Sequence, residues 1–452
     1  MNICEFLSGI PPFSDIESDA LTVLSVCARI QVFQPDEQII YAGEYGDALY
    51  VIFEGEVQVC ISEREGARHV AWLGPREMFG EMALITGDVR QADVFASTET
   101  ICVVIDKDPL YELLREDSSV AMFLTELVGQ RLVSGHQITQ VGKYQVLHEL
   151  GRGGMAIVYA GYHPQLRRSV AIKMLKHAYV FDHEFAEQFA AEASVVARLE
   201  HSNIVEVYDH EVAYGTQFIV MEMVNGLTLT ERMAADPQMD EGVVRRIIVQ
   251  LADALHYAHE AGIVHRDVKP DNVMLVPGEP LRLMDFGIAH RPADGDATVV
   301  GTPAYMAPEQ GERGPQDGRV DIYALGVIAF EMLTDTLPVV GEDDLDTIAR
   351  KATDPIPDVR TLRPNISDQM ISFIEKACQA DPEARFQSAL EIKRHFGVGE
   401  PLVRPGVRAR TVTLLYPSAE EGAVRNAIDQ LSATLAERDV LISAARHTQL
   451  TQ

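Results

Sequence analysis

The sequence predicts a multidomain α+β protein in which an N-terminal antiparallel β-roll with flanking helices precedes a two-lobed domain and a small α/β tail. The 452 residues suffice for about three domains of roughly 150 residues each. Strand-like alternation dominates residues 38–62 and 91–105, and a second strand-rich region further on gives way to long helical stretches. We therefore divide the chain into residues 1–140, residues 141–397, and a linker and tail of unknown role at residues 398–452.

The first region is typical of short strands followed by a helix. Val57, Val59 and Ile61 alternate with polar or small residues, and glycines mark the turns between the strand-like runs. After Pro109 the pattern changes, and apolar residues recur with helical spacing. This spacing predicts a helix over residues 118–140 that ends at about Gly142.

The second region begins with strand-like runs around a glycine-rich turn and continues as helices. Helical periodicity covers residues 184–199, 241–261 and 319–334, and this order of strands and helices indicates two lobes. The glycine- and proline-rich residues 397–408 are typical of a linker. The tail contains one strand-like run and one amphipathic helical run within residues 411–435.

Composition and charge exclude several classes of protein. Hydrophobic residues make up 47% of the chain and charged residues 23%, which is the balance of a globular protein. The net charge of −30, half of it within residues 1–140, disfavours a nucleic-acid partner. The five cysteines are scattered and form no C-x-x-C pair, which disfavours disulfides and zinc sites. The sequence shows no secretory signal and no membrane-length apolar run, so we expect a cytoplasmic protein without membrane insertion.

The second region carries groups suited to phosphoryl transfer. Gly151, Gly153 and Gly154 lie between two strand patterns, where glycine lets backbone amides approach phosphate oxygens, although a tight hairpin alone would also explain them. Lys173 follows on a strand, and Glu192 lies nineteen residues later in a helical run where its carboxylate could pair with that amine. Phosphoryl transfer requires a phosphate cradle, a cation, metal-binding oxygens and an oriented hydroxyl. The downstream sequence supplies the remaining groups in three motifs, which are His265-Arg266-Asp267, Asp285-Phe286-Gly287 and Ala307-Pro308-Glu309.

Taken together, these motifs make residues 144–397 resemble a eukaryotic-type protein kinase domain, particularly that of the bacterial Ser/Thr kinases. The resemblance implies a bilobal kinase fold and an enzyme that transfers the γ-phosphate of ATP to protein hydroxyls. It implies that Lys173 binds phosphates and pairs with Glu192, that Asp267 accepts or orients the substrate hydroxyl proton, and that Lys269 contacts the γ-phosphate. It assigns magnesium, with manganese as an alternative, to Asn272 and Asp285. The ATP-binding residues that it implies are Gly151, Gly153, Gly154, Val158, Ala171, Lys173, Met221, Glu222 and Val224.

The same resemblance implies structural and regulatory roles. Glu309 is expected to pair with Arg385, and Asp321 is expected to support the catalytic loop. Arg266 beside Asp267 is typical of a docking site for a phosphate on the activation loop, where Thr298 is the candidate for phosphorylation; an unmodified loop threonine is the alternative. Ala156 stands where many family members have a third glycine.

A second set of phosphate-binding groups lies in the first region. Glu81 and Arg90 are nine residues apart, within the runs Phe79-Gly80-Glu81-Met82-Ala83 and Arg90-Gln91-Ala92. A short helical turn can present amides to a phosphate, an arginine can bind it through two hydrogen bonds, and a carboxylate can accept from a ribose hydroxyl. Residues 5–140 therefore resemble a cyclic nucleotide-binding domain. The resemblance implies a cAMP or cGMP effector bound by Gly80, Glu81, Ala83, Arg90 and Gln91.

The role of this first region leaves alternatives open. It could be a roll without ligand that serves docking or dimerisation, with Arg90 paired to Glu81 or Asp93, and a homodimer is left open. Gln91 departs from the residues that accompany cAMP or cGMP in the family, so the base preference is open. We expect that ligand binding moves the helix at 118–140 and thereby changes kinase activity. The other interpretations are a kinase-fold scaffold and a constitutive kinase whose roll serves docking or dimerisation.

Overall fold

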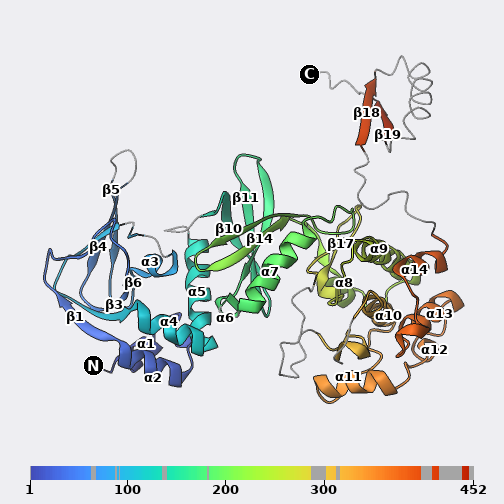
Figure 1. The fold of residues 1–452 in the computed structure, drawn as a ribbon, viewed down its shortest axis with the longest axis horizontal. Helices are drawn as coiled ribbons and strands as arrows, with labels where there is room; N and C mark the ends of the chain where they lie inside the picture. The colour runs from blue at the N-terminus through green and yellow to red at the C-terminus, as the bar shows by residue number, and fades with distance from the viewer. Residues whose placement is uncertain are drawn as a thin grey trace. The chain divides into compact units, whose positions relative to one another are not determined.

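The computed structural model describes residues 2–62, 68–86, 89–90, 92–134, 140–180, 183–286, 302–311, 316–398, 410–416 and 440–446. The chain forms two compact units. One contains Met1–Leu229 and Asp271–Val300, and the other contains Thr230–Pro270 and Gly301–Gln452. Figure 1 labels the helices and strands of both units.

The N-terminal part of the first unit is the predicted β-roll, built from two four-stranded antiparallel sheets. The strand orders are β1-β8-β3-β6 and β2-β7-β4-β5. Val57 and Val59 are buried between the sheets, as the alternation predicts, in a cluster that includes Ile52 and Val104. The strands are β1 (Arg29–Phe33), β2 (Gln38–Ile40), β3 (Ala48–Glu54), β4 (Val57–Ser62), β5 (Arg68–Leu73), β6 (Met78–Phe79), β7 (Ala92–Ala96) and β8 (Thr100–Asp106).

Helices flank the roll, and the last of them leads into the next sheet. The helices are α1 (Ile3–Ser8), α2 (Ser18–Cys27), α3 (Glu81–Thr86), α4 (Lys107–Glu116) and α5 (Ser118–Ser134). The prediction of a helix over residues 118–140 is confirmed by α5, but its predicted C-terminal end is wrong, because α5 ends at Ser134. Residues Gln140–Val141 form strand β9, and Gly142, with φ of +55°, makes the turn that pairs Val141 with Tyr144.

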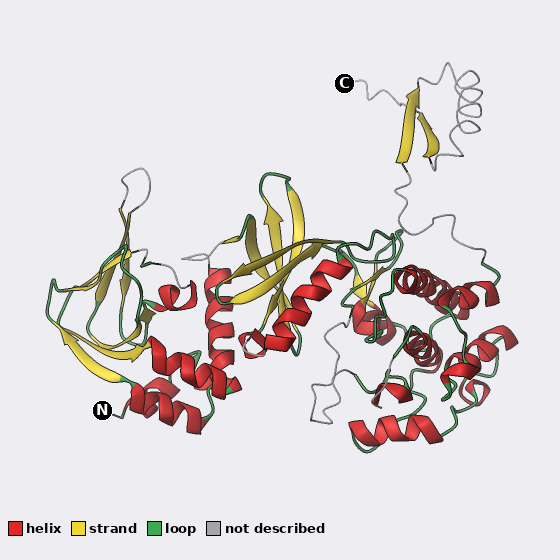
Figure 2. Cartoon of the chain, viewed as in Figure 1, coloured by secondary structure: helices red, strands yellow, loops and turns green. Residues whose placement is uncertain are grey.

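The next part of the first unit is a six-stranded sheet of order β13-β14-β12-β11-β10-β9, shown in yellow in Figure 2. Its strands are β10 (Tyr144–Arg152), β11 (Ala156–His163), β12 (Arg168–Leu175), β13 (Val207–Ala213) and β14 (Thr216–Glu222), after β9. Helices α6 (His177–Val180) and α7 (His183–Val196) follow β12. A small sheet of β15 (Leu227–Thr228), β16 (Val273–Leu275) and β17 (Arg282–Leu283) completes this unit.

Helix α5 shares one hydrophobic core with the six-stranded sheet. Phe123 and Leu127 of α5 belong to the same buried cluster as Tyr159, Ile172 and Phe218 of the sheet. Helix α5 also contacts β10 and α6, and Figure 1 shows it alongside the sheet. The roll and the sheet are therefore continuous in their packing, and burial of this apolar surface stabilises the contact.

The second unit is mostly helical, as predicted (Figure 2). Helix α9 (Glu241–Glu260) begins where Asp240 accepts hydrogen bonds from the amides of Gly242 and Val243, and its buried residues recur every three or four positions. The other helices are α8 (Leu229–Ala235), which starts at the end of the first unit, α10 (Arg319–Thr334), α11 (Asp344–Thr353), α12 (Val359–Leu362), α13 (Asp368–Ala377) and α14 (Ala389–His395). None of the helices within the described ranges is long and apolar enough to cross a bilayer.

The tail contains two parallel strands, β18 (Arg410–Tyr416) and β19 (Val440–Arg446). The first of them is the predicted strand-like run. The predicted helix that contains Val424 and Leu435 lies outside the described residues.

Candidate functional site

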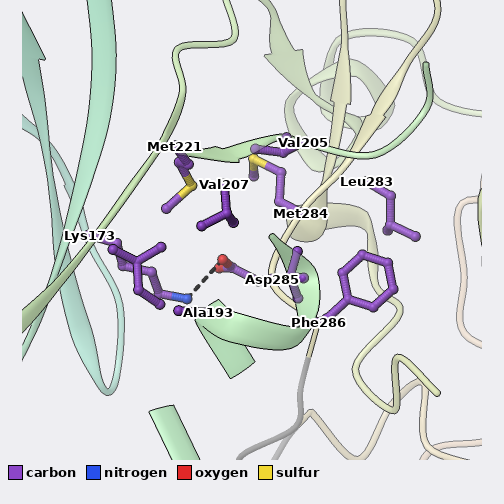
Figure 3. Close-up of a pocket in the computed structure, with 11 residues that line it drawn as sticks. Lys173, Ala193, Val205, Val207, Met221, Leu283, Met284, Asp285 and Phe286 are labelled. Carbon is purple, nitrogen blue, oxygen red and sulfur yellow. Dashed lines mark hydrogen bonds and ion pairs between the residues drawn. The ribbon is translucent and has the colours of Figure 1, made fainter. Parts of the chain in front are cut away.

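Lys173 and Asp285 meet at the edge of an apolar cavity in the first unit. Lys173 lies on β12, where it is paired with Val158 on one side and Ile219 on the other. Its Nζ atom lies 2.8 Å from Oδ1 of Asp285. A dashed line marks this pair in Figure 3. The other residues that line the cavity come from α7, from the chain that leads into and along β13, from β14, and from β17 and the segment after it. They are Ala193, Val196, Val205, Val207, Ile219, Met221, Leu283, Met284 and Phe286.

Glu192, the predicted partner of Lys173, lies on α7, which also carries Ala193 of the cavity wall. Its side chain lies outside the described part of the structure. The Lys173–Glu192 ion pair therefore stays a prediction.

The glycine-rich segment forms the tight turn between β10 and β11. The Gly153 amide donates to the Ala156 carbonyl at 2.9 Å, which closes the turn. A Cβ atom at Gly151 or Gly154 would meet no atom within 4 Å, so both glycines border open space. Space on the outer side of this turn is what a phosphate group would need in order to reach the backbone amides.

Four of the residues assigned to ATP binding belong to one apolar cluster. Ala171 and Met221 are buried in it, and Val158 and Val224 pack against it. Glu222, at the end of β14, pairs with Arg282 of β17, with 3.2 Å between Nε and Oε1. This pair connects the segment after β14 to the small sheet that leads to Asp285.

Asn272 and Asp285 are brought close by the pairing of β16 and β17. Asn272 is 5% exposed, and its carbonyl accepts from the Met284 amide at 2.8 Å, directly before Asp285. Their amide and carboxylate oxygens are ligands that suit Mg²⁺, which usually takes one or two protein ligands and completes its shell with water and phosphate oxygens. Within the described residues no three His, Cys, Asp or Glu side chains converge into a metal site.

The second unit holds the segment His265–Asp267 through one buried carboxylate. Asp321, 1% exposed, accepts from the amides of His265 at 2.9 Å and Arg266 at 2.7 Å, and its Oδ2 lies 2.7 Å from Nε2 of His259. Burial acts to raise the pKa of Asp321, but the hydrogen bonds and charges of His259 and His265 outweigh it and hold the pKa below its usual range. The expected support of the loop by Asp321 is thereby confirmed.

Asp267 lies in a short polar array with Lys269 and Thr302. Oδ2 of Asp267 lies 2.8 Å from Nζ of Lys269, and the same ammonium donates to the Thr302 hydroxyl at 3.2 Å. The array places a carboxylate that can accept a proton beside a fixed positive charge.

Glu309 and Arg385 form the expected pair. Arg385 is almost completely buried, and its two terminal nitrogens donate to Glu309 at 2.6 and 2.8 Å. Nε of Arg266 is buried and has no hydrogen-bond partner within the described residues. Thr298, the predicted phosphorylation site, and Gly287 lie outside the described ranges.

In the β-roll, Arg90 is turned inward. It is 7% exposed; one terminal nitrogen donates to the Gly80 carbonyl and the other to the Ala48 carbonyl at 2.8 Å. Gly80 has φ of +83°, and a Cβ there would lie 2.7 Å from the guanidinium, so this position requires glycine. Gln91 and the Ala83 side chain lie outside the description.

Glu81 pairs with α5 instead of Arg90. Its carboxylate is 1% exposed, and Oε1 lies 2.8 Å from a terminal nitrogen of Arg131. Burial raises the pKa of Glu81, and the charge of Arg131 acts against that rise. The alternative in which Arg90 pairs with Glu81 or Asp93 is wrong, because Arg90 binds backbone carbonyls and Asp93 accepts from the Ala42 amide and the Gln38 side chain.

Three side-chain contacts join α5 to the six-stranded sheet and α6. Glu126 pairs with Arg152 of the glycine-rich segment, which also binds Glu149. The Thr125 hydroxyl accepts from the His177 amide at 2.9 Å and lies 3.1 Å from its Nδ1.

The third contact involves Gly129 and Tyr159, since a Cβ at Gly129 would lie 2.8 Å from the Tyr159 hydroxyl.

Sequence reasoning missed Arg131, Glu126 and most of the apolar residues of the cavity, although it assigned Met221 to ATP binding. Arg131 and Glu126 are ordinary polar positions on a helical pattern, and neither belongs to a motif. The cavity residues alternate along strands as any core residues do. Only the packing of α5 and the strands reveals their positions.

Comparison with known proteins assigns a family to each region. The protein kinase domain family matches residues 144–396, and the cyclic nucleotide-binding domain family matches residues 30–117. Serine/threonine-protein kinase PrkC of Bacillus subtilis is 35% identical over 256 residues, which cover 56% of this chain and 40% of that protein. Serine/threonine-protein kinase PknB of Mycobacterium leprae is 36% identical over 261 residues, which cover 56% of this chain and 42% of that protein.

The chain thus spans about two fifths of the length of these curated relatives. Among solved structures, the PknI kinase domain of Mycobacterium tuberculosis is 32% identical, with a TM-score of 0.48. The match covers 57% of this chain and 96% of that one.

Proposed function

Because the chain belongs to the protein kinase domain family and joins a bacterial-type Ser/Thr kinase domain to a cyclic nucleotide-binding domain, we propose that it phosphorylates serine or threonine hydroxyls of proteins with ATP. The observation that carries this proposal is the pair of Asp267 and Lys269, on a loop that a buried Asp321 holds, with Thr302 bound to the same ammonium. A rigid carboxylate beside a fixed cation suits the acceptance of a hydroxyl proton next to a charged phosphoryl group.

The roles of the remaining residues follow from their positions. The Lys173 ammonium supplies positive charge for the ATP phosphates at the entrance of the cavity, and the glycine-rich turn offers backbone amides. Asn272 and Asp285 would hold magnesium, with manganese as an alternative, and the metal would neutralise phosphate charge when bound. Asp267 orients the substrate hydroxyl and takes its proton, while Lys269 stabilises the charge on the transferred group.

Transfer of labelled phosphate from ATP to a generic basic protein tests this proposal. The intact chain should label the substrate, and Asp285→Ala should reduce the rate by at least a hundredfold, since it removes a metal-binding oxygen and the partner of Lys173. Asp271→Ala, beside Asn272 but not assigned to the reaction, is the control. Labelling by the Asp285→Ala chain at the normal rate would contradict the assignment, and no labelling by the intact chain would favour the scaffold interpretation.

Cyclic nucleotide control is the second part of the proposal. Arg90 is already aimed at the Gly80 and Ala48 carbonyls, and an anionic phosphate is a stronger acceptor than either. Glu81 would accept from a ribose hydroxyl, but it is occupied by Arg131 of α5. Ligand and α5 would therefore compete for Glu81, and α5 packs on the kinase sheet. A ligand that binds the two arrangements of α5 with different affinity shifts their populations.

Calorimetry and kinase assays with cAMP and cGMP test the control. Arg90→Ala should abolish nucleotide binding, whereas Arg131→Met should bind nucleotide more tightly and show, without ligand, the activity of the liganded intact chain. Arg115→Met, an exposed arginine on α4, is the matched control. Absence of binding heat at millimolar nucleotide would leave a kinase whose roll serves docking or dimerisation.

Phosphorylation of Thr298 is the third part of the proposal. Nε of Arg266 supports it, since this atom is buried and has no hydrogen-bond partner in the described part of the chain, and a phosphate on the loop between Asp285 and Glu309 would supply the acceptor. Phosphopeptide mass spectrometry of active protein should find Thr298 modified. An unmodified Thr298 in fully active protein would refute this role.

A further inference from the structure

Lys351 is a buried lysine whose amine, among the described residues, donates hydrogen bonds to one short segment only. The amine also lies over the ring of Tyr323, 5.6 Å from its centroid. Lys351 lies on α11 and is 3% exposed. Its Nζ atom donates to the carbonyls of Pro303 and Ala304 at 2.6 Å each and of Met306 at 3.0 Å. An ammonium has three hydrogens, and the three carbonyls match them. The contact therefore fixes the direction of three carbonyl groups within four residues.

The segment that Lys351 holds is tied to the catalytic loop at its other end. The Thr302 hydroxyl accepts from Lys269, which pairs with Asp267. The Tyr305 hydroxyl donates to Glu331 of α10 at 2.8 Å, so the middle of the segment is anchored as well. Thr302, at the start of the segment, is thus linked to Asp267 through Lys269, so a protein whose hydroxyl lies at Asp267 comes close to this segment.

Among the described residues Lys351 has no carboxylate partner. Burial of an unpaired lysine is costly, which argues against Lys351 only filling space in the core. A hydrocarbon side chain would fill the same space without desolvating a charge. The hydrogen bonds to the segment are what the lysine adds.

We propose that Lys351 is a positioning residue that sets residues 303–306 as the surface on which the substrate chain lies next to its phosphorylated residue. This inference rests on the proposed kinase activity. The side chain touches neither ATP nor the reacting hydroxyl in this assignment; it acts through the backbone that it holds. Its removal should therefore weaken the binding of protein substrate more than the binding of ATP.

Steady-state kinetics of Lys351→Met with a serine-containing peptide test the inference. The KM for peptide should rise at least tenfold, while the KM for ATP stays within about twofold of the intact chain. Arg350→Met, the neighbouring exposed arginine that pairs with Asp354, is the matched control on α11 and should keep both constants. An unchanged peptide KM, or equal changes in both constants, would overturn the inference.

A second measurement uses the intact chain and does not depend on whether Lys351→Met folds. A peptide with a photoreactive residue beside its serine should crosslink to residues 302–311, and crosslinks confined to other segments would overturn the inference. The intact chain also separates the two proposals. If it transfers phosphate but the variant keeps its peptide KM, only the role of Lys351 fails; if it transfers none, both proposals fall.

Discussion

At the scale of single residues, the buried carboxylate of Asp321 is the group on which the catalytic loop depends. Asp321→Asn replaces one acceptor oxygen with an NH₂ group that faces donors. The amides of His265 and Arg266 donate to different oxygens of Asp321, so the asparagine can keep only one of these two hydrogen bonds. We expect a loss of about 2–4 kcal/mol in the free energy of unfolding, and a fall in kcat of at least tenfold. Urea denaturation and phosphate-transfer kinetics measure the two effects.

Asp317→Asn is the matched control for this prediction, because Asp317 is exposed and pairs with Arg319 at the surface. Its cost should stay within about 1 kcal/mol. Equal destabilisation by the two variants would show that Asp321 does not hold the loop.

The site residues that the sequence predicts are those whose chemistry demands a particular residue type, and their catalytic and metal-binding roles stay predictions. Lys173, Asp267 and Asp285 stand in motifs whose spacing carries information, and the structure places each beside a fitting partner. The Glu81–Arg131 pair was not predicted, since the sequence separates these residues by fifty positions and a surface arginine on a helix looks like any other. Side-chain pairing across elements depends on packing that a linear pattern does not contain.

At the scale of elements, the close approach of α5 to β11 requires a glycine. Gly129→Ala would place a Cβ 2.8 Å from the hydroxyl of Tyr159, a ring that is itself completely buried. We expect a loss of about 1–3 kcal/mol in the free energy of unfolding, because either the ring or α5 must shift. Tyr159→Phe removes the hydroxyl, which has no hydrogen-bond partner among the described residues. The double variant should recover most of the loss, and additive costs in urea denaturation would refute the contact.

The same interface contains a histidine that has to stay neutral. His177 is completely buried, and burial lowers its pKa to about 4. Below pH 6.5 the folded state therefore binds fewer protons than the unfolded state. The contribution of neutral His177 to the free energy of unfolding is complete above pH 6.5 and is lost as the pH falls towards 4. The loss amounts to roughly 3 kcal/mol over that range.

Urea denaturation at pH 7 and pH 4.5 measures this loss against variants that cannot titrate. Between the two pH values, the free energy of unfolding of His177→Gln should fall by about 2–3 kcal/mol less than that of the intact chain. The carboxylates titrate in both proteins, so their contribution is the same. His148→Gln, at an exposed position of β10, should lose as much as the intact chain. Equal losses in all three proteins would mean that His177 is not the titrating group.

Element boundaries were harder to predict than element types. Both the roll and the helical pattern of α5 were predicted correctly, but the helix was expected to continue to Gly142. Periodicity continues past Ser134 without showing that the chain returns as β9 to pair with β10, because that pairing depends on a partner strand. The order of the six strands is likewise a property of tertiary packing.

At the scale of the whole molecule, α5 connects Glu81, the carboxylate that we propose binds a nucleotide ribose, to the glycine-rich segment. Arg131 binds Glu81 of the roll, and Glu126, on the same helix, binds Arg152 at the end of β10. A change at the Glu81–Arg131 pair or at the Glu126–Arg152 pair therefore acts on the same helix. If the two sites are coupled in this way, thermodynamic linkage requires that each ligand changes the affinity of the other by the same factor.

Titration of cyclic nucleotide with and without a non-hydrolysable ATP analogue, and the reverse titration, measures the two factors. They should agree in the intact chain, at a value in the range of roughly 5–150. Glu126→Gln should bring both factors close to one, because it weakens the connection between α5 and Arg152. Glu149→Gln removes a carboxylate from the same arginine but leaves α5 attached, so it should preserve the coupling. Loss of coupling in both variants would assign the effect to the charge of Arg152 itself, and coupling that survives Glu126→Gln would require a route through the shared apolar core of α5 and the sheet.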